Sequence, residues 1–147
     1  LALRLARSKA ETVAARYPKA LVIGSDQTAD IDGALLSKPE NFTRAARQLQ
    51  QCSGRAVTFC TGLVVVCIDR EIACETVEPF EVHFRVLSTP EISAYLHAEE
   101  PYDCAGSFKV EGLGITLFER LQGRDPTSLE GLPLIALSHI LRSVEVL

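Results

Sequence analysis

Two runs rich in β-forming residues, separated by a short polar turn, constrain the fold of this chain more than any other feature. Ala56 to Ile68 is rich in Val, Thr and Phe, and Ile72 to Val86 follows after Asp69-Arg70. This pattern predicts two long strands joined by a turn, which together form an antiparallel ribbon. Any fold proposed for the chain has to contain this ribbon.

Helical and strand-like segments alternate around the ribbon. A helix is expected over residues 1–17, where Leu5, Lys9 and Val13 recur every four positions, and a buried strand over Ala20 to Gly24. Three more helices are expected: one over Asn41 to Gln51, one from the cap-and-proline signal at Ser88, and a final one that begins at Leu132-Pro133 and carries Val144. This order predicts one α/β domain over residues 1–147 with a mixed sheet.

Composition excludes several functional classes. Fifteen Lys and Arg against nineteen Asp and Glu give a net charge of −4, which argues against a non-specific nucleic-acid binder. No apolar run approaches the roughly 20 residues that span a bilayer, so no membrane partner is expected. The five cysteines are odd in number and include no C-x-x-C pair. We expect reduced cysteines that act as small apolar residues in a cytoplasmic protein.

The first candidate site is Gly24-Ser25-Asp26-Gln27, directly after the expected buried strand. Open α/β sheets place their ligands at the carboxyl ends of such strands. A carboxylate there can hold a divalent ion or take a proton from an attacking water. The alternative is that Asp26 only caps a turn, which is a common use of Asp.

Two lysines are further candidates. Lys38 precedes Pro39 and the expected second helix, whose free N–H groups would add to its field at a phosphate oxygen. Lys9 lies on the first helix, one turn from Leu5 and from Val13. The alternatives are that Lys38 is an ordinary surface lysine and that Lys9 extends its stem along the core while its charge stays in water.

The third candidate is the glycine-containing loop from Tyr102 to Gly114, which a short apolar element, Ile115 to Leu121, follows. Its glycines allow the backbone to approach a ligand closely, and Glu111 can accept hydrogen bonds from a base edge. The alternative is an exposed loop with a solvated Glu. The three histidines form no constellation, and no Walker-type or G-x-G-x-x-G loop is present.

Taken in order, six motifs resemble the Maf (septum-formation inhibitor-like) pyrophosphatase family along nearly the whole chain. They are Leu3-Arg4-Leu5-Ala6-Arg7-Ser8-Lys9-Ala10, Ile23-Gly24-Ser25-Asp26-Gln27, Ser37-Lys38-Pro39, Ser53-Gly54-Arg55, Tyr102-Asp103-Cys104-Ala105-Gly106-Ser107-Phe108 and Gly131-Leu132-Pro133-Leu134. The resemblance implies a Maf/inosine-triphosphatase-like α/β fold, with a mixed twisted sheet flanked by helices. It also implies hydrolysis of nucleoside triphosphates between the α and β phosphates, which gives the monophosphate and pyrophosphate.

The resemblance also implies roles for individual residues. Asp26 matches the family's proposed proton acceptor and is the candidate metal ligand, and Lys9 and Lys38 match lysines that serve the triphosphate. The implied cofactor is a divalent cation, magnesium or manganese. This chemistry needs such a set, because charge concentrates on phosphate oxygens while water loses a proton. A homodimer is the oligomeric state common in the family, although no sequence feature decides it.

Two positions, Gln27 and Glu111, resemble the family's 7-methyl-GTP branch rather than its dTTP/UTP branch, which typically has Thr and Gln there. The guanine Watson–Crick edge offers N1–H and the N2 amino group, two donors that one carboxylate accepts together. N7-methylation also makes the base cationic, which favours a negative Glu. The expected function is therefore 7-methyl-GTP hydrolysis, a house-cleaning of modified nucleotides, with dTTP/UTP hydrolysis as the alternative.

The chain departs from the family pattern at its start. Family members begin with a strand and an S-x-S-P-R-R-like loop that contacts phosphates, followed by an acidic residue that supports the metal. These features are not found in the sequence, which also contains no methionine, not even at position 1. We therefore expect a fragment that lacks this first strand and loop. A catalytically inactive nucleotide-binding remnant is thus an alternative to an enzyme, and a direct role in cell division is a weaker one.

Overall fold

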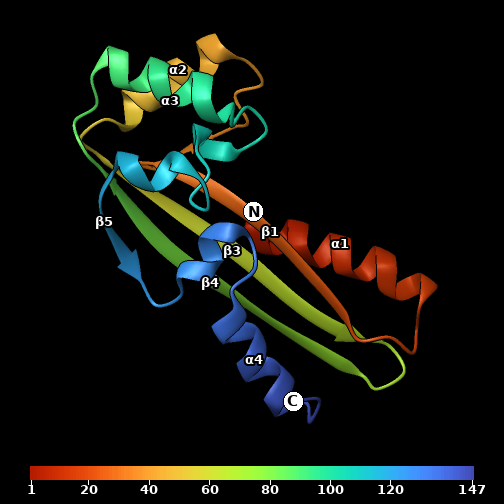
Figure 1. The fold of residues 1–147 in the computed structure, drawn as a ribbon. Helices are drawn as coiled ribbons and strands as arrows, with labels where there is room; N and C mark the ends of the chain where they lie inside the picture. Colours follow the sequence, from red (N-terminus) through yellow and green to blue (C-terminus); the bar gives the residue numbers. More distant parts are fainter. The chain divides into compact units, whose positions relative to one another are not determined.

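The two β-rich runs form the predicted ribbon in the computed structural model, which describes all 147 residues (Figure 1). They are strands β3 (Ala56–Cys67) and β4 (Ile72–Phe84). Three further strands are β1 (Val22–Ile31), β2 (Ala34–Leu36) and β5 (Phe118–Gly123). The five strands form one sheet in the order β2-β1-β3-β4-β5.

The sheet is antiparallel, where the prediction had a mixed sheet within the confirmed α/β class. The reason lies in the turn at Asp32-Gly33, where both residues have positive φ, 50° and 85°. This turn pairs β1 with β2, with Ala29 opposite Leu36, and so reverses the chain before the helical connection begins. The chain then enters β3 from the opposite direction to β1.

The predicted helices are confirmed to within two residues at their starts. They are α1 (Ala2–Arg16), α2 (Phe42–Cys52), α3 (Thr89–Glu99) and α4 (Leu134–Ser143). Asn41 caps α2 by accepting a hydrogen bond from Arg44 N at 2.9 Å, and Ser88 caps α3 by accepting from Glu91 N at 3.2 Å. Short 3₁₀ turns lie at η1 (Ala105–Ser107), η2 (Leu113–Leu117) and η3 (Pro126–Glu130). None of the helices combines the length and apolar character that crossing a membrane requires.

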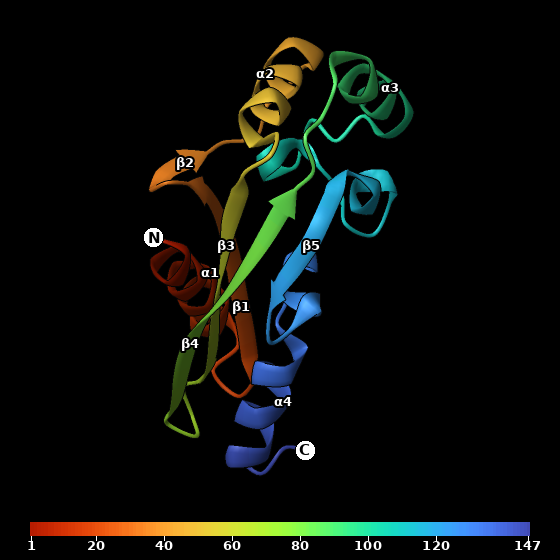
Figure 2. The same ribbon diagram turned by 90° about the vertical axis from the view of Figure 1, so that its left-hand side faces the viewer.

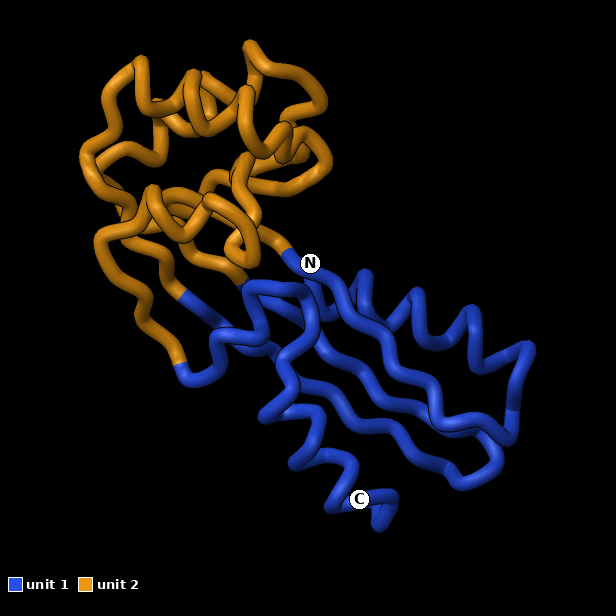
Figure 3. Tube along the Cα trace, in the orientation of Figure 1, with its two compact units in different colours: residues 1–27, 60–80, 124–147 blue, residues 28–59, 81–123 orange.

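The chain forms two compact units, which Figure 3 colours separately. The first unit comprises residues 1–27, 60–80 and 124–147, and the second comprises residues 28–59 and 81–123. The strands β1, β3 and β4 each contribute one part to each unit. The predicted site residues Lys9, Asp26 and Gln27 therefore belong to the first unit, and Lys38 and Glu111 to the second.

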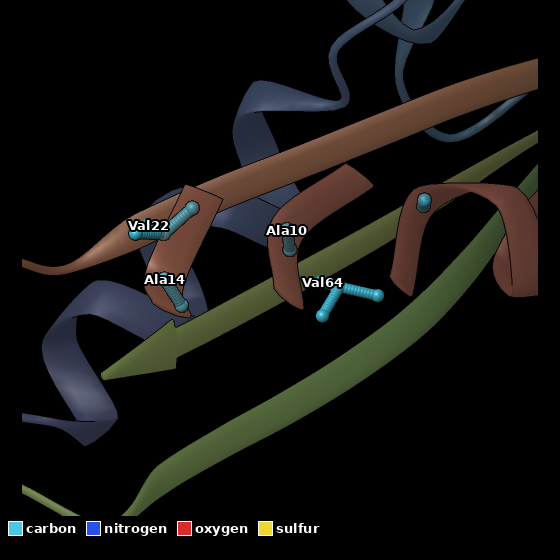
Figure 4. Packing of buried hydrophobic residues seen from close by; sticks show 5 residues of the cluster. Ala10, Ala14, Val22 and Val64 are labelled. Atoms are coloured by element: carbon cyan, nitrogen blue, oxygen red, sulfur yellow. The ribbon is translucent and has the colours of Figure 1, made fainter. Parts of the chain in front are cut away.

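In the first unit, α1 packs on the sheet through its alanine face. Ala6, Ala10 and Ala14 are buried against Val22 of β1 and Val64 of β3 (Figure 4). The sequence pattern had placed Leu5, Lys9 and Val13 on the apolar face, but Leu5 and Val13 are 39% and 44% exposed. The face of small residues is buried instead, because the helix lies too close to the strands for larger side chains.

Two glycines of the sheet permit this close approach. A Cβ added to Gly24 would lie 2.5 Å from the Ala6 carbonyl oxygen, and one added to Gly62 would lie 2.7 Å from backbone atoms of Ala2. Neither the helix backbone nor the strand backbone can move aside as a flexible side chain does. The close packing of α1 on the sheet therefore requires glycine at both positions.

We predict that Gly62→Ala lowers the free energy of unfolding by about 2 kcal/mol, because the added methyl group overpacks the helix–sheet contact. Urea unfolding followed by circular dichroism measures the change. The control is Ala73→Val, which adds carbon atoms at an exposed position of β4 and should change stability by about 0.5 kcal/mol or less. A Gly62→Ala protein as stable as the parent would contradict the close packing of α1.

The opposite face of the sheet in the first unit carries α4. Leu63 and Val65 of β3 alternate with Val64, so their side chains point away from α1 and pack with Leu137 and Ile140 of α4. Figure 2 shows α1 and α4 flanking these strands from the two sides. The first unit is thus a three-layer arrangement of helix, sheet and helix.

The first turn of α4 is capped by two side chains from the preceding η3 segment. Asp125, which is 1% exposed, accepts hydrogen bonds from Thr127 N at 2.9 Å and from Ile135 N at 2.8 Å. The Thr127 hydroxyl accepts a hydrogen bond from Leu134 N at 3.0 Å. Burial raises the pKa of Asp125, but the hydrogen bonds from Thr127 and Ile135 together lower it by more. The pKa of Asp125 therefore lies below its usual value.

This arrangement predicts a pH-dependent contribution to stability. Because the folded pKa of Asp125 lies below the unfolded one (about 3.9), the contribution is complete above the unfolded value. It disappears as the pH falls through the folded pKa. We expect Asp125→Asn to cost about 1–2 kcal/mol at pH 7 and to flatten the loss of stability on acidification. Thermal unfolding between pH 7 and pH 2 measures both effects.

The matched control for this prediction is Glu130→Gln, which removes the same charge from an exposed position of η3. Its stability should fall on acidification with the same slope as that of the parent. An Asp125→Asn profile that runs parallel to the parent profile would show that this carboxylate does not cap α4.

The second unit is held together by an aromatic cluster. Phe108 contacts Phe59, Phe84 and Phe118 in edge-to-face geometry, with ring centroids 5.0–5.6 Å apart. Helices α2 and α3 pack against each other in this unit, and Phe42 stacks on His97 with a centroid distance of 4.9 Å. The cluster holds the middle of the loop that follows Tyr102, through Phe108.

Candidate functional site

Lys9 and Asp26 form an ion pair in the first unit. The Lys9 Nζ lies 2.6 Å from Asp26 Oδ1, and the two side chains are 60% and 18% exposed. The pair connects the middle of α1 with the middle of β1. It forms because Gly24 and Asp26 point to the same face of the strand, and Gly24 brings that face against α1.

This geometry answers two questions that the sequence left open. Asp26 lies inside β1 rather than beyond its carboxyl end, so it caps no turn, and its predicted place after a short strand is wrong. Lys9 does not only extend its stem along the core, because its ammonium group meets a carboxylate. Lys9 contacts only Oδ1, and a carboxylate has a second oxygen that can accept a proton from water.

Gln27, also in the first unit, belongs to a buried hydrogen-bond network. Its Nε2 donates to Thr61 Oγ1 at 3.0 Å and to the Ser128 carbonyl oxygen at 2.7 Å. Thr61 Oγ1 donates to the same carbonyl oxygen at 3.1 Å, and Thr61 and Ser128 are almost completely buried. Both donors of the Gln27 amide are thus used within the protein, and only its carbonyl oxygen, Oε1, remains as a group for contacting a ligand.

Lys38 lies in the second unit, in the connection between β2 and α2. Its side chain is exposed, while the next residue, Pro39, is buried. The buried proline anchors the connection just before Asn41 caps the second helix. Contact of this exposed cation with an anion stays a prediction.

Glu111 is also in the second unit, in an ordered loop. Lys109 N donates to the Tyr95 hydroxyl at 3.0 Å. The pKa of Tyr95 is raised, mainly because the side chain is buried. Leu113 N donates to Glu99 Oε1 at 3.3 Å. The same Glu99 carboxylate lies over Gly112, where a side chain could fit only if the Glu99 side chain moved aside. The exposed Glu111 therefore projects from a loop that is fixed on both sides.

Cys52 and Cys104 are not activated as nucleophiles. Burial raises the pKa of the Cys52 thiol to about 12 and that of Cys104 to about 11, so both stay protonated near neutral pH. Cys52, Cys67, Cys74 and Cys104 form no disulfide. These features agree with the expectation of reduced cysteines that serve mainly as apolar residues.

The chain offers no multi-residue metal cage. No three His, Cys, Asp or Glu side chains cluster closely enough to hold a metal ion. Magnesium does not need such a cage, because it is usually bound by one or two carboxylates together with substrate phosphates and water. Asp26 alone therefore does not fit a resident metal bound by protein ligands only, whereas one carboxylate suffices for a cation held mainly by phosphate oxygens and water.

Several buried polar residues were not predicted from the sequence. Glu78, 3% exposed, forms a two-pronged ion pair with Arg124 at 3.2 and 3.1 Å, beside a pocket of about 500 Å³ between β4 and α4. Thr61 and Asp125 are also buried and hydrogen-bonded, and the half-buried Gln48 forms two side-chain hydrogen bonds. No motif marks these residues, and the partners of Glu78 and Thr61 lie 46 and 67 residues away in the chain. Only the apolar runs around Thr61 could have hinted at its burial.

The comparison with known protein families gives one finding. The family model described as Maf-like protein matches residues 1–144, which is nearly the whole chain. The match includes all five predicted site residues and the residues that hold them in place.

Proposed function

Because the chain belongs to the Maf-like protein family, a family of nucleoside triphosphate pyrophosphatases, we propose that it hydrolyses 7-methyl-GTP to 7-methyl-GMP and pyrophosphate. The observation that carries this proposal is the Lys9–Asp26 pair. It places a cation for phosphate oxygens 2.6 Å from a carboxylate that can accept a proton. The proposed role is the removal of modified nucleotides.

The reaction adds water across the bond between the α and β phosphates. The water oxygen forms a new bond to the α phosphorus, and the bond from this phosphorus to the bridging oxygen breaks. Pyrophosphate leaves with the electron pair of that bond. Asp26 takes a proton from the water, and Lys9 stabilises the charge on the phosphate oxygens. Lys38 is proposed as a second cation for the triphosphate, on the basis of its family motif.

Recognition of the base is proposed for Glu111 and Gln27. A carboxylate accepts from both guanine donors and attracts the positive charge that N7-methylation creates. A good two-pronged contact of this kind discriminates by about 1–3 kcal/mol between bases. The fixed loop around Glu111 supports this proposal, because a rigid acceptor loses less entropy on binding. Gln27 can contribute only its carbonyl oxygen.

A divalent cation, magnesium or manganese, is proposed to accompany the triphosphate, with Asp26 as its protein ligand. When bound, such a cation neutralises phosphate oxygens. Cysteines without disulfides support the proposal that the enzyme works in the reducing cytoplasm. A homodimer is proposed only because this oligomeric state is common in the family.

A comparison of nucleotides tests the proposed substrate. We would measure kcat/KM for 7-methyl-GTP, GTP, dTTP and UTP with magnesium and with manganese. The proposal expects 7-methyl-GTP to be hydrolysed fastest and GTP next, because both offer the guanine edge. Faster hydrolysis of dTTP or UTP would replace the proposed branch with the alternative one. Binding without turnover for any nucleotide would favour the inactive remnant.

A further inference from the structure

Two loops of the second unit lie side by side, and each carries a residue that the proposed function assigns to the nucleotide. The segment 37–40 contains Lys38, and the segment 102–112 contains Glu111. The Glu40 backbone N–H donates to the Tyr102 carbonyl oxygen at 2.9 Å and so joins the two segments directly.

The charges of the two loops also influence each other. The pKa of Asp103 lies below its usual range, first because its own backbone N–H donates to the carboxylate. The Cys104 thiol and the ammonium groups of Lys109 and Lys38 lower it further. Lys38 in segment 37–40 therefore lowers the pKa of Asp103 in segment 102–112.

Gln48 of α2 contacts both loops with the two ends of one amide group. Its Nε2 donates to the Ser37 carbonyl oxygen at 2.7 Å, and its Oε1 accepts from Ser107 Oγ at 2.6 Å. The amide orientation is fixed, because a backbone carbonyl oxygen can only accept a hydrogen bond. Ser37 directly precedes Lys38, and Ser107 lies four residues before Glu111.

The Ser107 end of this connection needs support. Ser107 has a φ of 64°, directly after Gly106 with a φ of 81°, and its side chain is completely buried. A residue other than glycine keeps such a backbone conformation only where its surroundings impose it. The hydrogen bond to Gln48 and the buried ring of Phe108 supply that constraint. Losing Gln48 would therefore release this loop as well as leave a buried hydroxyl without its acceptor.

We propose that Gln48 is a positioning residue that couples the Lys38 loop to the Glu111 loop, so that phosphate binding and base recognition occur in one fixed geometry. This inference rests on the proposed function for the roles of Lys38 and Glu111. Gln48 itself touches no substrate in this account. Its effect passes through the Ser37 carbonyl oxygen on one side and the Ser107 hydroxyl on the other.

The kinetic consequence is a coupling that depends on Gln48. In the parent protein, the Lys38→Ala and Glu111→Gln substitutions each change kcat/KM for 7-methyl-GTP by a factor. The kcat/KM of the double variant should differ by about fivefold from the value that these two factors give when multiplied, as expected for coupled sites. In a Gln48→Ala background the same two effects should multiply. A general loss of stability would scale all rates and leave the coupling unchanged. A coupling that survives Gln48→Ala would overturn the proposal.

Hydrogen–deuterium exchange of the whole chain without nucleotide tests the structural basis separately from turnover. Gln48→Ala should speed exchange about fivefold or more in both segments, 37–40 and 102–112. Gln48→Glu retains an acceptor for Ser107 but loses the donor to Ser37, so only the first segment should change. Ser107→Ala should change only the second. Gln50→Ala, at an exposed position of α2, is the control and should change neither.

These patterns are specific to a residue that connects two loops. The proposal would be overturned if Gln48→Ala exchanged at the parent rate in both segments. It would also be overturned if Gln48→Glu and Ser107→Ala each accelerated exchange equally in both segments. Because the exchange measurement needs no substrate, its result stands apart from the pyrophosphate assay, which tests the proposed function.

Discussion

Replacing Asp26 with Asn lowers kcat for pyrophosphate release from 7-methyl-GTP by about a thousandfold in our account, within the range of about 10²–10⁴ for a lost general base. Asn has the same shape and still offers an oxygen to Lys9, 2.6 Å away in the parent. It cannot accept the proton of the attacking water. Binding of the nucleotide should therefore change much less than turnover.

The measurement is a steady-state assay of pyrophosphate with the parent and the variant. The control is Asp69→Asn, which removes the same charge from the exposed turn between β3 and β4. It should retain kcat within about twofold, since surface substitutions have small effects. A urea unfolding curve of Asp26→Asn shows that the fold is intact. If Asp26→Asn retained more than a tenth of the activity, the proton would have to go elsewhere.

The second large effect concerns the choice of base. Glu111→Gln should reduce the ratio of kcat/KM for 7-methyl-GTP to that for UTP by about ten- to a hundredfold, consistent with about 1–3 kcal/mol for a two-pronged base contact. The amide can accept only one of the two guanine donors, and it turns its own N–H group toward the other. It also loses the attraction to the cationic methylated ring.

Glu119→Gln is the matched control for this substitution, because it changes the same side chain at an exposed position of β5 in the same unit. The ratio should stay at the parent value in this control. An unchanged ratio in Glu111→Gln would remove Glu111 from base recognition and with it the main argument for the 7-methyl-GTP branch. The Lys9–Asp26 chemistry would remain as proposed.

Sequence patterns predicted the helices and the β3–β4 ribbon because their signals are local. The Ser88-Thr89-Pro90 start and the turn at Asp69-Arg70 each act within a few residues. The direction of the sheet was not predicted, because it depends on a three-residue strand, β2, that is too short to leave a pattern.

The site shows the same division between local and distant causes. Asp26 and Lys9 were selected as candidates from the sequence, but their pairing depends on the absence of a side chain at Gly24. The recurrence of Leu5, Lys9 and Val13 every four positions suggested the wrong face of α1, because close packing selects small residues over large ones. Gln48 carries no motif, and its partners lie 11 and 59 residues away in the chain.

The most direct test of the central claim is the product balance of the parent chain with 7-methyl-GTP and magnesium. We predict that 7-methyl-GMP and pyrophosphate form in equal amounts, and that both are lost in Asp26→Asn. Release of orthophosphate in place of pyrophosphate, or equal pyrophosphate formation by Asp26→Asn, would contradict the proposal that the Lys9–Asp26 pair hydrolyses the bond between the α and β phosphates.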